Sequence, residues 1–110
     1  MLLKSTQGVK AVPVGEDAKN TKVRWLISDP DGAPNFAMRL FEIGPHGATP
    51  LHAHAWEHEV FVLEGEGIVV GAEGDREMVP GDAIFIPGEE LHQFRSSGTG
   101  MLKMLCMIPI

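Results

Sequence analysis

Short apolar segments separated by turn-forming residues run through the whole sequence, and they restrict the folds open to it. The chain has 110 residues, of which 13 are Gly and 8 are Pro. Frequent Gly and Pro disfavour long helices, and short apolar runs between turns are typical of β-sandwiches and barrels. Strands are predicted at residues 22–28, 36–43, 58–63, 67–71, 83–86, 92–95 and 101–108. The sequence therefore predicts an all-β chain.

Length and charge exclude several classes of protein. A chain of this length holds a single domain with one core. The formal net charge is −6 and the basic residues are scattered, unlike the basic patches of nucleic-acid-binding proteins. No apolar run approaches the roughly 20 residues that cross a membrane, and the N-terminus lacks the apolar core of a signal peptide. We expect a cytoplasmic protein that binds neither nucleic acid nor membrane, and the single cysteine, Cys106, agrees with a reducing compartment.

The first part of the chain differs from the rest. Residues 8–20 show the least regular pattern of apolar positions. We therefore predict an N-terminal arm over residues 1–20, able to pack against a partner subunit, and a barrel over residues 21–110.

Side-chain alternation predicts which face of two strands points inward. Successive side chains of a strand point to opposite faces, so the wholly apolar face is the better candidate for the interior. In the last strand that face carries Leu102, Met104, Cys106 and Ile108. The same reasoning applied to residues 36–43 turns Met38 and Leu40 inward and Arg39 outward.

The strand at residues 58–63 has apolar side chains on both faces. Phe61 and Leu63 share a face with Glu59, so its outer face is also apolar. A large apolar surface is normally covered. We expect a second sheet or a second subunit to cover it, and a homodimer would do so.

The histidines form the main candidate for a functional site. His52, His54 and His58 follow one another at steps of two and four residues, so in a strand all three point to one face. His92 follows a turn and can be brought beside them by a neighbouring antiparallel strand. Imidazole is the commonest metal ligand among side chains. The sequence therefore predicts a metal site and leaves His46 as a solvated loop residue.

These residues, with the glycines and proline around them, resemble the two conserved motifs of the cupin superfamily. The first motif is a glycine, then HxH, three or four residues, a glutamate, six residues and a glycine. The second is a glycine, five residues, PxG, two residues and a histidine. The matching positions are Gly47, His52, His54, His58 or Glu59, Gly65, Gly81, Pro87 and His92. The resemblance implies a single-domain cupin barrel, the double-stranded β-helix or jelly roll.

Three positions depart from the family pattern. Gly47 lies one residue closer to HxH than the motif requires, Glu89 replaces the glycine of PxG, and Ser96 stands where asparagine is common. None of these positions is a ligand of the metal in the motif.

The family's glutamate ligand matches either of two positions in this chain. His58 leaves the six residues before Gly65 that the motif requires, whereas Glu59 leaves five. Strand parity also turns Glu59 away from the other histidines. We therefore predict that His52, His54, His58 and His92 are the ligands.

A four-histidine set is similar to the manganese-binding branch of small single-barrel cupins. That resemblance implies a six-coordinate ion with two adjacent open positions, and Mn(II) as the first candidate. Fe(II), Ni(II), Cu(II) and Zn(II) remain open, because nitrogen ligands bind these ions more tightly than manganese. Four neutral ligands leave the full charge on the ion, which favours anionic or enolate-like substrates. A purely structural zinc site is less in keeping with the sequence, since such sites usually contain several cysteines.

Several functions are compatible with such a site. The leading hypothesis is a metal-dependent oxygenase of the dioxygenase type, acting on a small organic substrate and dioxygen in a pocket lined by Met38, Leu40, Phe94, Met104 and Cys106. No protein base is evident, which suits redox chemistry. The alternatives are an isomerase or lyase acting on a small sugar or oxo acid, and a noncatalytic small-molecule or metal-binding protein. Cys106 is either a residue near the metal or a small buried hydrophobe.

Overall fold

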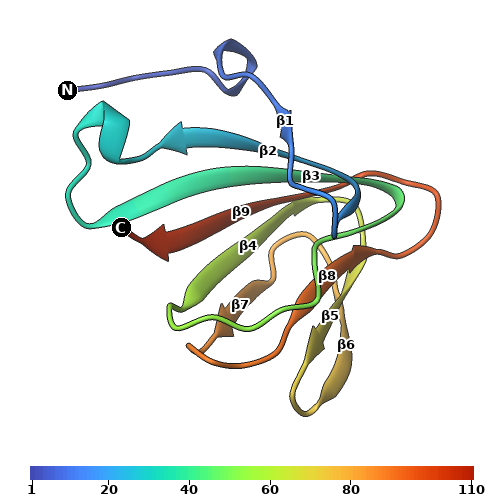
Figure 1. The fold of residues 1–110 in the computed structure, drawn as a ribbon. Helices are drawn as coiled ribbons and strands as arrows, with labels where there is room; N and C mark the ends of the chain where they lie inside the picture. Colours follow the sequence, from blue (N-terminus) through green and yellow to red (C-terminus); the bar gives the residue numbers. More distant parts are fainter.

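The computed structural model describes residues 1–110 and is built almost entirely of antiparallel strands (Figure 1). The strands are β1 (Val12–Pro13), β2 (Lys19–Ile27), β3 (Phe36–Ala48), β4 (His58–Glu64), β5 (Gly67–Gly71), β6 (Gly74–Met78), β7 (Ala83–Ile86), β8 (Gln93–Ser96) and β9 (Leu102–Pro109). The 3-10 helices are η1 (Thr6–Gly8) and η2 (Asp29–Asp31). The predicted all-β barrel is confirmed. No helix has the length and apolar character needed to cross a membrane.

The strands form one strongly curled sheet. Their order is β6-β5-β8-β3-β9-β4-β7, with β2 paired to β3 and β1 paired to β2. The 13-residue strand β3 joins the two parts of the sheet, because residues 36–43 pair with β9 whereas Ala48 pairs with Arg95 of β8. Figure 1 shows β5, β6 and β8 folded beneath the longer strands. The curl encloses the core and leaves a mouth beside the β3–β4 connection.

Two segments differ from the predicted strands. Strand β6 was not predicted, because its sequence, GDREM, has a single apolar residue and is exposed except at Met78. Strand β3 continues through residues 44–48, beyond the predicted end at residue 43, although this stretch contains Gly and Pro. A side chain at Gly47 would approach the backbone oxygens of Gly44, Asn20 and Lys19 to 2.8–2.9 Å. The glycine is therefore needed because β2 passes close by.

The core fills the inside of the curled sheet. Its buried side chains come from β2, β3, β4, β7, β8 and β9 and from the end of β6. They are Val23, Phe41, Ile43, Val60, Val62, Met78, Ile86, Phe94, Leu102, Met104 and Cys106. The predicted inward face of the last strand is confirmed at Leu102, Met104 and Cys106, each at most 2% exposed.

The predicted facing of β3 is wrong. Phe41 belongs to the core and Arg39 lines the interior cavity, whereas Met38 and Leu40 lie on the opposite face. The prediction assumed that a face carrying an arginine points to solvent. In the structure the guanidinium packs against aromatic rings inside the barrel, so the charged residue is accommodated there.

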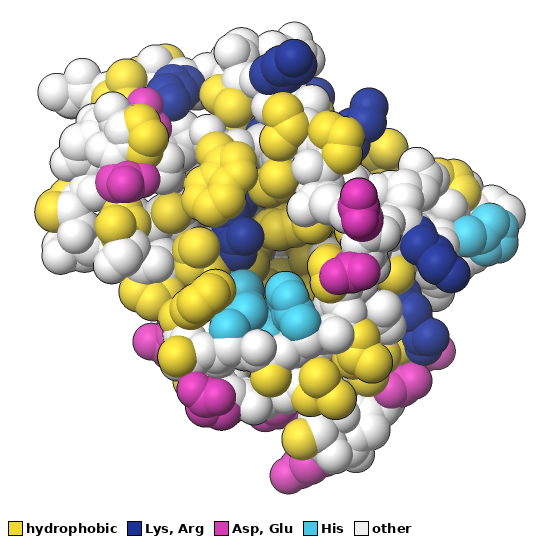
Figure 2. Space-filling model, in the orientation of Figure 1, with side chains coloured by type: hydrophobic (Ala, Val, Ile, Leu, Met, Phe, Trp, Pro, Cys, Tyr) yellow, Lys and Arg dark blue, Asp and Glu magenta, His cyan; other side chains and the backbone are white.

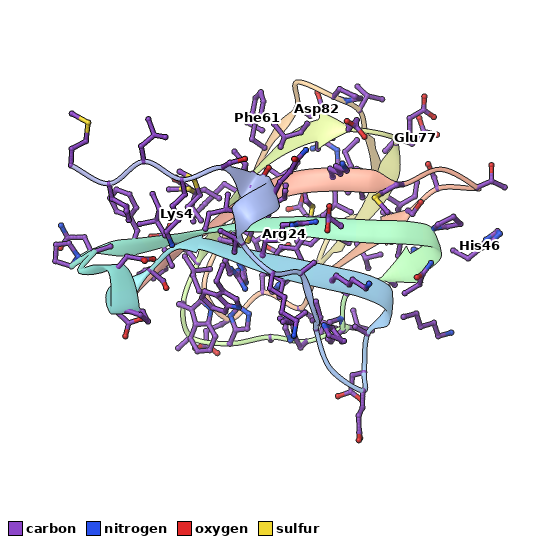
Figure 3. The ribbon with its side chains drawn as sticks, turned by 90° about the horizontal axis from the view of Figure 1, so that it is seen from above. Lys4, Arg24, His46, Phe61, Glu77 and Asp82 are labelled. Atoms are coloured by element: carbon purple, nitrogen blue, oxygen red, sulfur yellow. The ribbon has the colours of Figure 1, made fainter.

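The N-terminal segment covers the outer face of β2 and β3. Arg24 lies opposite Leu40 in the sheet, so the two side chains share a face. The Nη1 of Arg24 donates to the carbonyl oxygens of Thr6 (3.0 Å) and Val9 (2.7 Å). Figure 3 shows η1 lying over Arg24. This cover explains why Leu40 is buried without belonging to the core. The division of the chain into residues 1–20 and 21–110 stays a prediction.

Candidate metal centre

Backbone hydrogen bonds hold the four histidines at the mouth of the barrel. His58 is the first residue of β4. His52 and His92 form an isolated antiparallel bridge, in which each backbone N–H donates to the other residue's carbonyl oxygen (3.1 and 3.0 Å). The carbonyl oxygen of His54 accepts a 2.7 Å hydrogen bond from the N–H of Glu89. Segments distant in sequence are thus tied together at the histidines themselves.

The departure from the family motif at Glu89 has a local structural role. Glu89 has a φ of 72°, in the left-handed region that glycine adopts most easily. This conformation directs its N–H to His54. The preceding Gly88 has no room for a side chain, because a Cβ there would collide with the carbonyl oxygen of Ala55. The turn therefore adopts a backbone conformation typical of glycine although Glu89 stands at that position.

The imidazole nitrogens lie at distances that suit one ion. The Nε2 atoms of His54 and His58 are 2.9 Å apart, and one nitrogen from each of the four rings falls within 4.8 Å of all the others. Nitrogens bound at about 2.0–2.2 Å to a common ion lie roughly 3 Å apart when adjacent and about 4.4 Å apart when opposite. The donor set therefore fits a divalent transition metal with only small adjustments.

The other ring nitrogens are held by neighbouring groups. The Nδ1 of His92 lies 2.8 Å from the carbonyl oxygen of Glu90, and the Nδ1 of His54 lies 3.2 Å from that of Trp56. The Nδ1 of His58 lies 3.2 Å from the Sγ of Cys106. A proton on Nδ1 donates to such an acceptor and leaves Nε2 free to bind metal. These contacts therefore orient three of the rings toward a shared centre.

Burial favours the uncharged form of three of the four histidines, His52, His58 and His92. Burial, together with the charges of His92 and Arg39, lowers the pKa of His58 to about 3. Burial is also the main cause of the lowered pKa values of His52 and His92. Metal binding requires neutral imidazole, so these histidines are in the ligand form at neutral pH.

The two remaining candidates from the sequence lie elsewhere. Glu59 is exposed on the outer face of β4, opposite Phe85 and Met107 in the sheet. His46 is exposed near the end of β3 and points away from the body of the protein (Figure 3). Neither the carboxylate of Glu59 nor the imidazole of His46 reaches the four-histidine cluster.

The histidines line one side of a cavity of about 280 Å³. Figure 2 shows histidine side chains in a hollow surrounded by hydrophobic ones, with a basic side chain inside it. The cavity lining is Val14, Trp25, Arg39, Phe41, Thr49, Pro50, His52, His54, Trp56, His58, His92, Phe94, Met104, Cys106 and Ile108. It contains no carboxylate, and Arg39 is its only Lys or Arg.

The predicted pocket agrees with this lining in part. Phe94, Met104 and Cys106 line the cavity, but Met38 and Leu40 do not, because β3 faces the other way. Sequence reasoning missed Trp25, Arg39 and Phe41 as lining residues. The sequence did hold a signal for the lining face of β3. Each face of the strand carries one charged residue, Arg39 on one and Glu42 on the other, so the arginine alone did not decide which face points inward.

The family comparison agrees with the fold and the histidine cluster. The family model described as "Cupin domain" matches residues 39–108, which include all four histidines. The chain is a cupin. Its membership explains the paired glycine and histidine motifs and the jelly-roll arrangement of the strands. The chemistry within this family varies, so the activity must be argued from the site.

Two solved structures resemble this cupin along nearly its whole length. The polyketide cyclase RemF from Streptomyces resistomycificus is 40% identical, with a TM-score of 0.92 over 99% of this chain and 79% of that one. A cupin-2 domain protein from Rhodospirillum rubrum is 28% identical, with a TM-score of 0.87 over 98% of this chain and 74% of that one.

A curated relative carries a different activity in its name. The 1-methylthio-D-xylulose 5-phosphate methylsulfurylase of Rhodospirillum rubrum is 37% identical over 71 residues, which is 64% of this chain and 46% of that protein. The chain spans about half the length of the curated relatives it matches. The names of these relatives therefore indicate different reactions, a cyclisation and a methylsulfurylase activity.

Proposed function

We propose that this cupin is a metal-dependent cyclase acting on a small polyketide-like substrate inside the barrel. The observation that carries the proposal is the aromatic, carboxylate-free cavity beside the four histidines. The 40% identity to a polyketide cyclase over almost the whole chain supports the same reaction class. A linear polyketone has a carbon skeleton that becomes planar as the ring forms and aromatises, and it carries carbonyl oxygens that suit a metal centre.

The protein's own residues would bind and shape the substrate. Trp25, Phe41 and Phe94 supply aromatic walls that fold a flexible chain and exclude water from it. Trp56 stacks on His54 with ring centroids 4.1 Å apart, at the exposed edge of the cavity. Together these rings favour a compact conformer, in which the two carbons to be joined lie close to each other.

His52, His54, His58 and His92 would hold the ion, and a bound divalent ion would supply Lewis-acid polarisation of a carbonyl oxygen. Hydrogens on carbon beside a polarised carbonyl are acidified, so ring closure needs only a weak proton acceptor such as water. Burial raises the pKa of Cys106, which keeps its sulfur protonated at neutral pH. Mn(II) is the proposed ion on the resemblance to the four-histidine branch, and elemental analysis of protein purified without added metal tests that identity.

An oxygenase is the second candidate function. The absence of Asp and Glu from the cavity favours it, because a redox reaction needs no carboxylate base. The two candidates differ in their need for dioxygen. An isomerase acting on sugars is less well supported, since the aromatic lining offers few hydrogen-bonding groups to hydroxyls.

The cyclase proposal predicts turnover without dioxygen. Heptane-2,4,6-trione closes to a methylresorcinol by joining two carbons and losing one water, with no oxidant. We expect the metal-loaded protein to accelerate this conversion equally in air and under nitrogen, and the chelated protein to lose the acceleration. Mass spectrometry of the product and a dissolved-oxygen electrode provide the readouts. Product that contains added oxygen, or a reaction that stops under nitrogen, would support the oxygenase instead.

We also propose that a second copy covers the outer face of β4 and β7. Phe61 and Phe85 are 44% and 57% exposed there, beside Leu105 and Met107 in an apolar groove. Figure 3 shows Phe61 pointing outward from the body of the protein. Contiguous exposed apolar residues of this kind indicate an interaction surface, whereas singly scattered ones do not. A homodimer would bury it.

A dimer formed through this groove predicts that charged substitutions in the groove lower the mass of the sedimenting species. The double variant Phe61→Lys/Phe85→Glu should sediment as a monomer, whereas the wild type and Leu91→Lys, an exposed apolar position outside the groove, should sediment as dimers. Analytical ultracentrifugation at several concentrations measures this. A monomeric wild type at tens of micromolar would rule the dimer out.

A further inference from the structure

Arg39 is a cation built into the cavity wall. Its guanidinium carbon lies 5.2 Å from the ring centroid of Trp25 and 4.8 Å from that of Phe41. Its Nη2 donates to the Sγ of Cys106 at 3.1 Å and lies 3.4 Å from the Nδ1 of His58. The aromatic rings and the sulfur hold the guanidinium in one place beside the metal-binding histidines.

The protein leaves this cation without a counter-ion. The Nε of Arg39 is buried and makes no hydrogen bond, and Nη1 makes none to the protein. The four ion pairs of the structure all involve other cations, and no Asp or Glu lines the cavity. A half-buried charge without a partner is costly, and cation–π contacts offset that cost only in part. The missing partner is therefore expected to come from a ligand.

We propose that Arg39 binds the anionic group of the substrate, and that this group is a carboxylate on a planar, largely apolar molecule. The inference rests on the proposed function only in placing the substrate in this cavity. A guanidinium presents two parallel N–H groups that match the two oxygens of a carboxylate. The rings of Trp25 and Phe41, which also line the cavity, suit a flat aromatic or conjugated body.

The same surroundings disfavour a phosphate. A phosphate group carries more charge and needs more donors than one guanidinium provides. Thr49 is the only hydroxyl in the lining, and its oxygen is already engaged with the backbone of Phe94, accepting from the N–H at 2.9 Å. The cavity therefore offers one strong anion-binding group among apolar walls.

The position of Arg39 also constrains the shape of the ligand. The guanidinium contacts the Nδ1 of His58, while the Nε2 of the same ring faces His54. One imidazole ring thus separates the anion-binding group from the nitrogens that would hold metal. We infer a ligand with two recognition points, an oxygen donor directed to the metal and a carboxylate directed to Arg39.

Intrinsic fluorescence can report the binding directly. The chain has two tryptophans, Trp25 and Trp56, and both line the cavity. We would titrate the protein with cinnamate, its neutral amide cinnamamide, and phenyl phosphate, and confirm each dissociation constant by calorimetry. The titrations are run on the metal-loaded protein and again after chelation, when Arg39 is the only cation in the cavity.

Wild-type protein is expected to bind cinnamate at least about tenfold more tightly than cinnamamide and phenyl phosphate, as a charge-assisted hydrogen bond would give. Arg39→Met should remove this preference, leave cinnamamide binding within about twofold, and retain the metal, because it removes a positive charge beside the ion. Arg39→Lys should recover part of the preference, since it keeps the charge without the planar fork. The matched control is Arg95→Met, which removes an exposed arginine outside the cavity and should change nothing.

Three outcomes would overturn the inference. These are absence of saturable cinnamate binding by the wild type, equal binding of cinnamate and cinnamamide, and an unchanged preference in a folded Arg39→Met protein. Tighter binding of phenyl phosphate than of cinnamate would overturn the assignment of a carboxylate. None of these measurements requires turnover. A protein that prefers cinnamate through Arg39 but fails to cyclise the triketone would leave this inference standing while the cyclase proposal fails.

Discussion

Replacing His58 with alanine should weaken metal binding by about a hundredfold or more, whereas replacing its neighbour Glu59 should leave metal binding unchanged. Loss of a residue that only orients a ligand already costs about 10- to 100-fold in affinity, and loss of the ligand itself should cost more. His58 points into the cluster with its Nε2 2.9 Å from that of His54, and Glu59 points outward from the same strand. Competition with a calibrated chelator measures the affinities, and elemental analysis gives the stoichiometry.

A second histidine variant separates ligand loss from unfolding. His58 is buried, so its replacement also changes packing, but His52 is exposed and can become alanine without leaving a cavity in the core. Both variants should lose metal while their circular dichroism spectra match the wild type. Metal retained by His58→Ala and lost by Glu59→Ala would show that the glutamate is the ligand, as it is in the family motif.

Replacing Gly65 with alanine should destabilise the fold by about 3 kcal/mol or more. Gly65 connects β4 to β5 with a φ of 78°, a conformation strained for other residues. A Cβ at this position would also collide with the carbonyl oxygen of Met101, and backbone cannot move aside as a side chain can. Urea denaturation measures the loss as a lower midpoint at an unchanged slope.

Two other glycines separate the causes of this effect. Gly74 has a φ of 114° with open space around it, so Gly74→Ala carries the conformational strain without the collision. Gly100→Ala meets neither problem and serves as the baseline. We expect Gly65→Ala to cost clearly more than Gly74→Ala. Equal losses would mean that the contact with Met101 is relieved by a small shift of the backbone.

The sequence predicted which four histidines come together, because strand parity and motif spacing agree at His58. The same parity turns Glu59 to the outer face of β4, where the structure places it. The last strand was also oriented correctly, since one of its faces is wholly apolar and the other carries Lys103. In both strands the local pattern and the packing of the barrel favour one orientation.

The same rule failed at β3 for a physical reason. It treats an arginine as a surface residue, but Arg39 lies inside, where aromatic rings and a sulfur atom contact it. Leu40 is buried on the opposite face because the N-terminal segment covers it, which alternation within the strand does not reveal. Strand β6 was missed because its pairing with β5 does not depend on apolar side chains. These features depend on contacts between segments distant in sequence.

The backbone bridge between His52 and His92 reduces the conformational entropy that the site loses when it binds metal. Each residue satisfies the other's peptide group, so the backbone of two of the four histidines is held in place by the fold before any ion binds. Metal binding then restricts few additional torsion angles, so the ordering of loops offsets little of the binding free energy. The barrel should accordingly remain folded when stripped of metal, in contrast to small zinc domains whose folding depends on the ion. Metal exchange in this protein would therefore proceed through a structured vacant site.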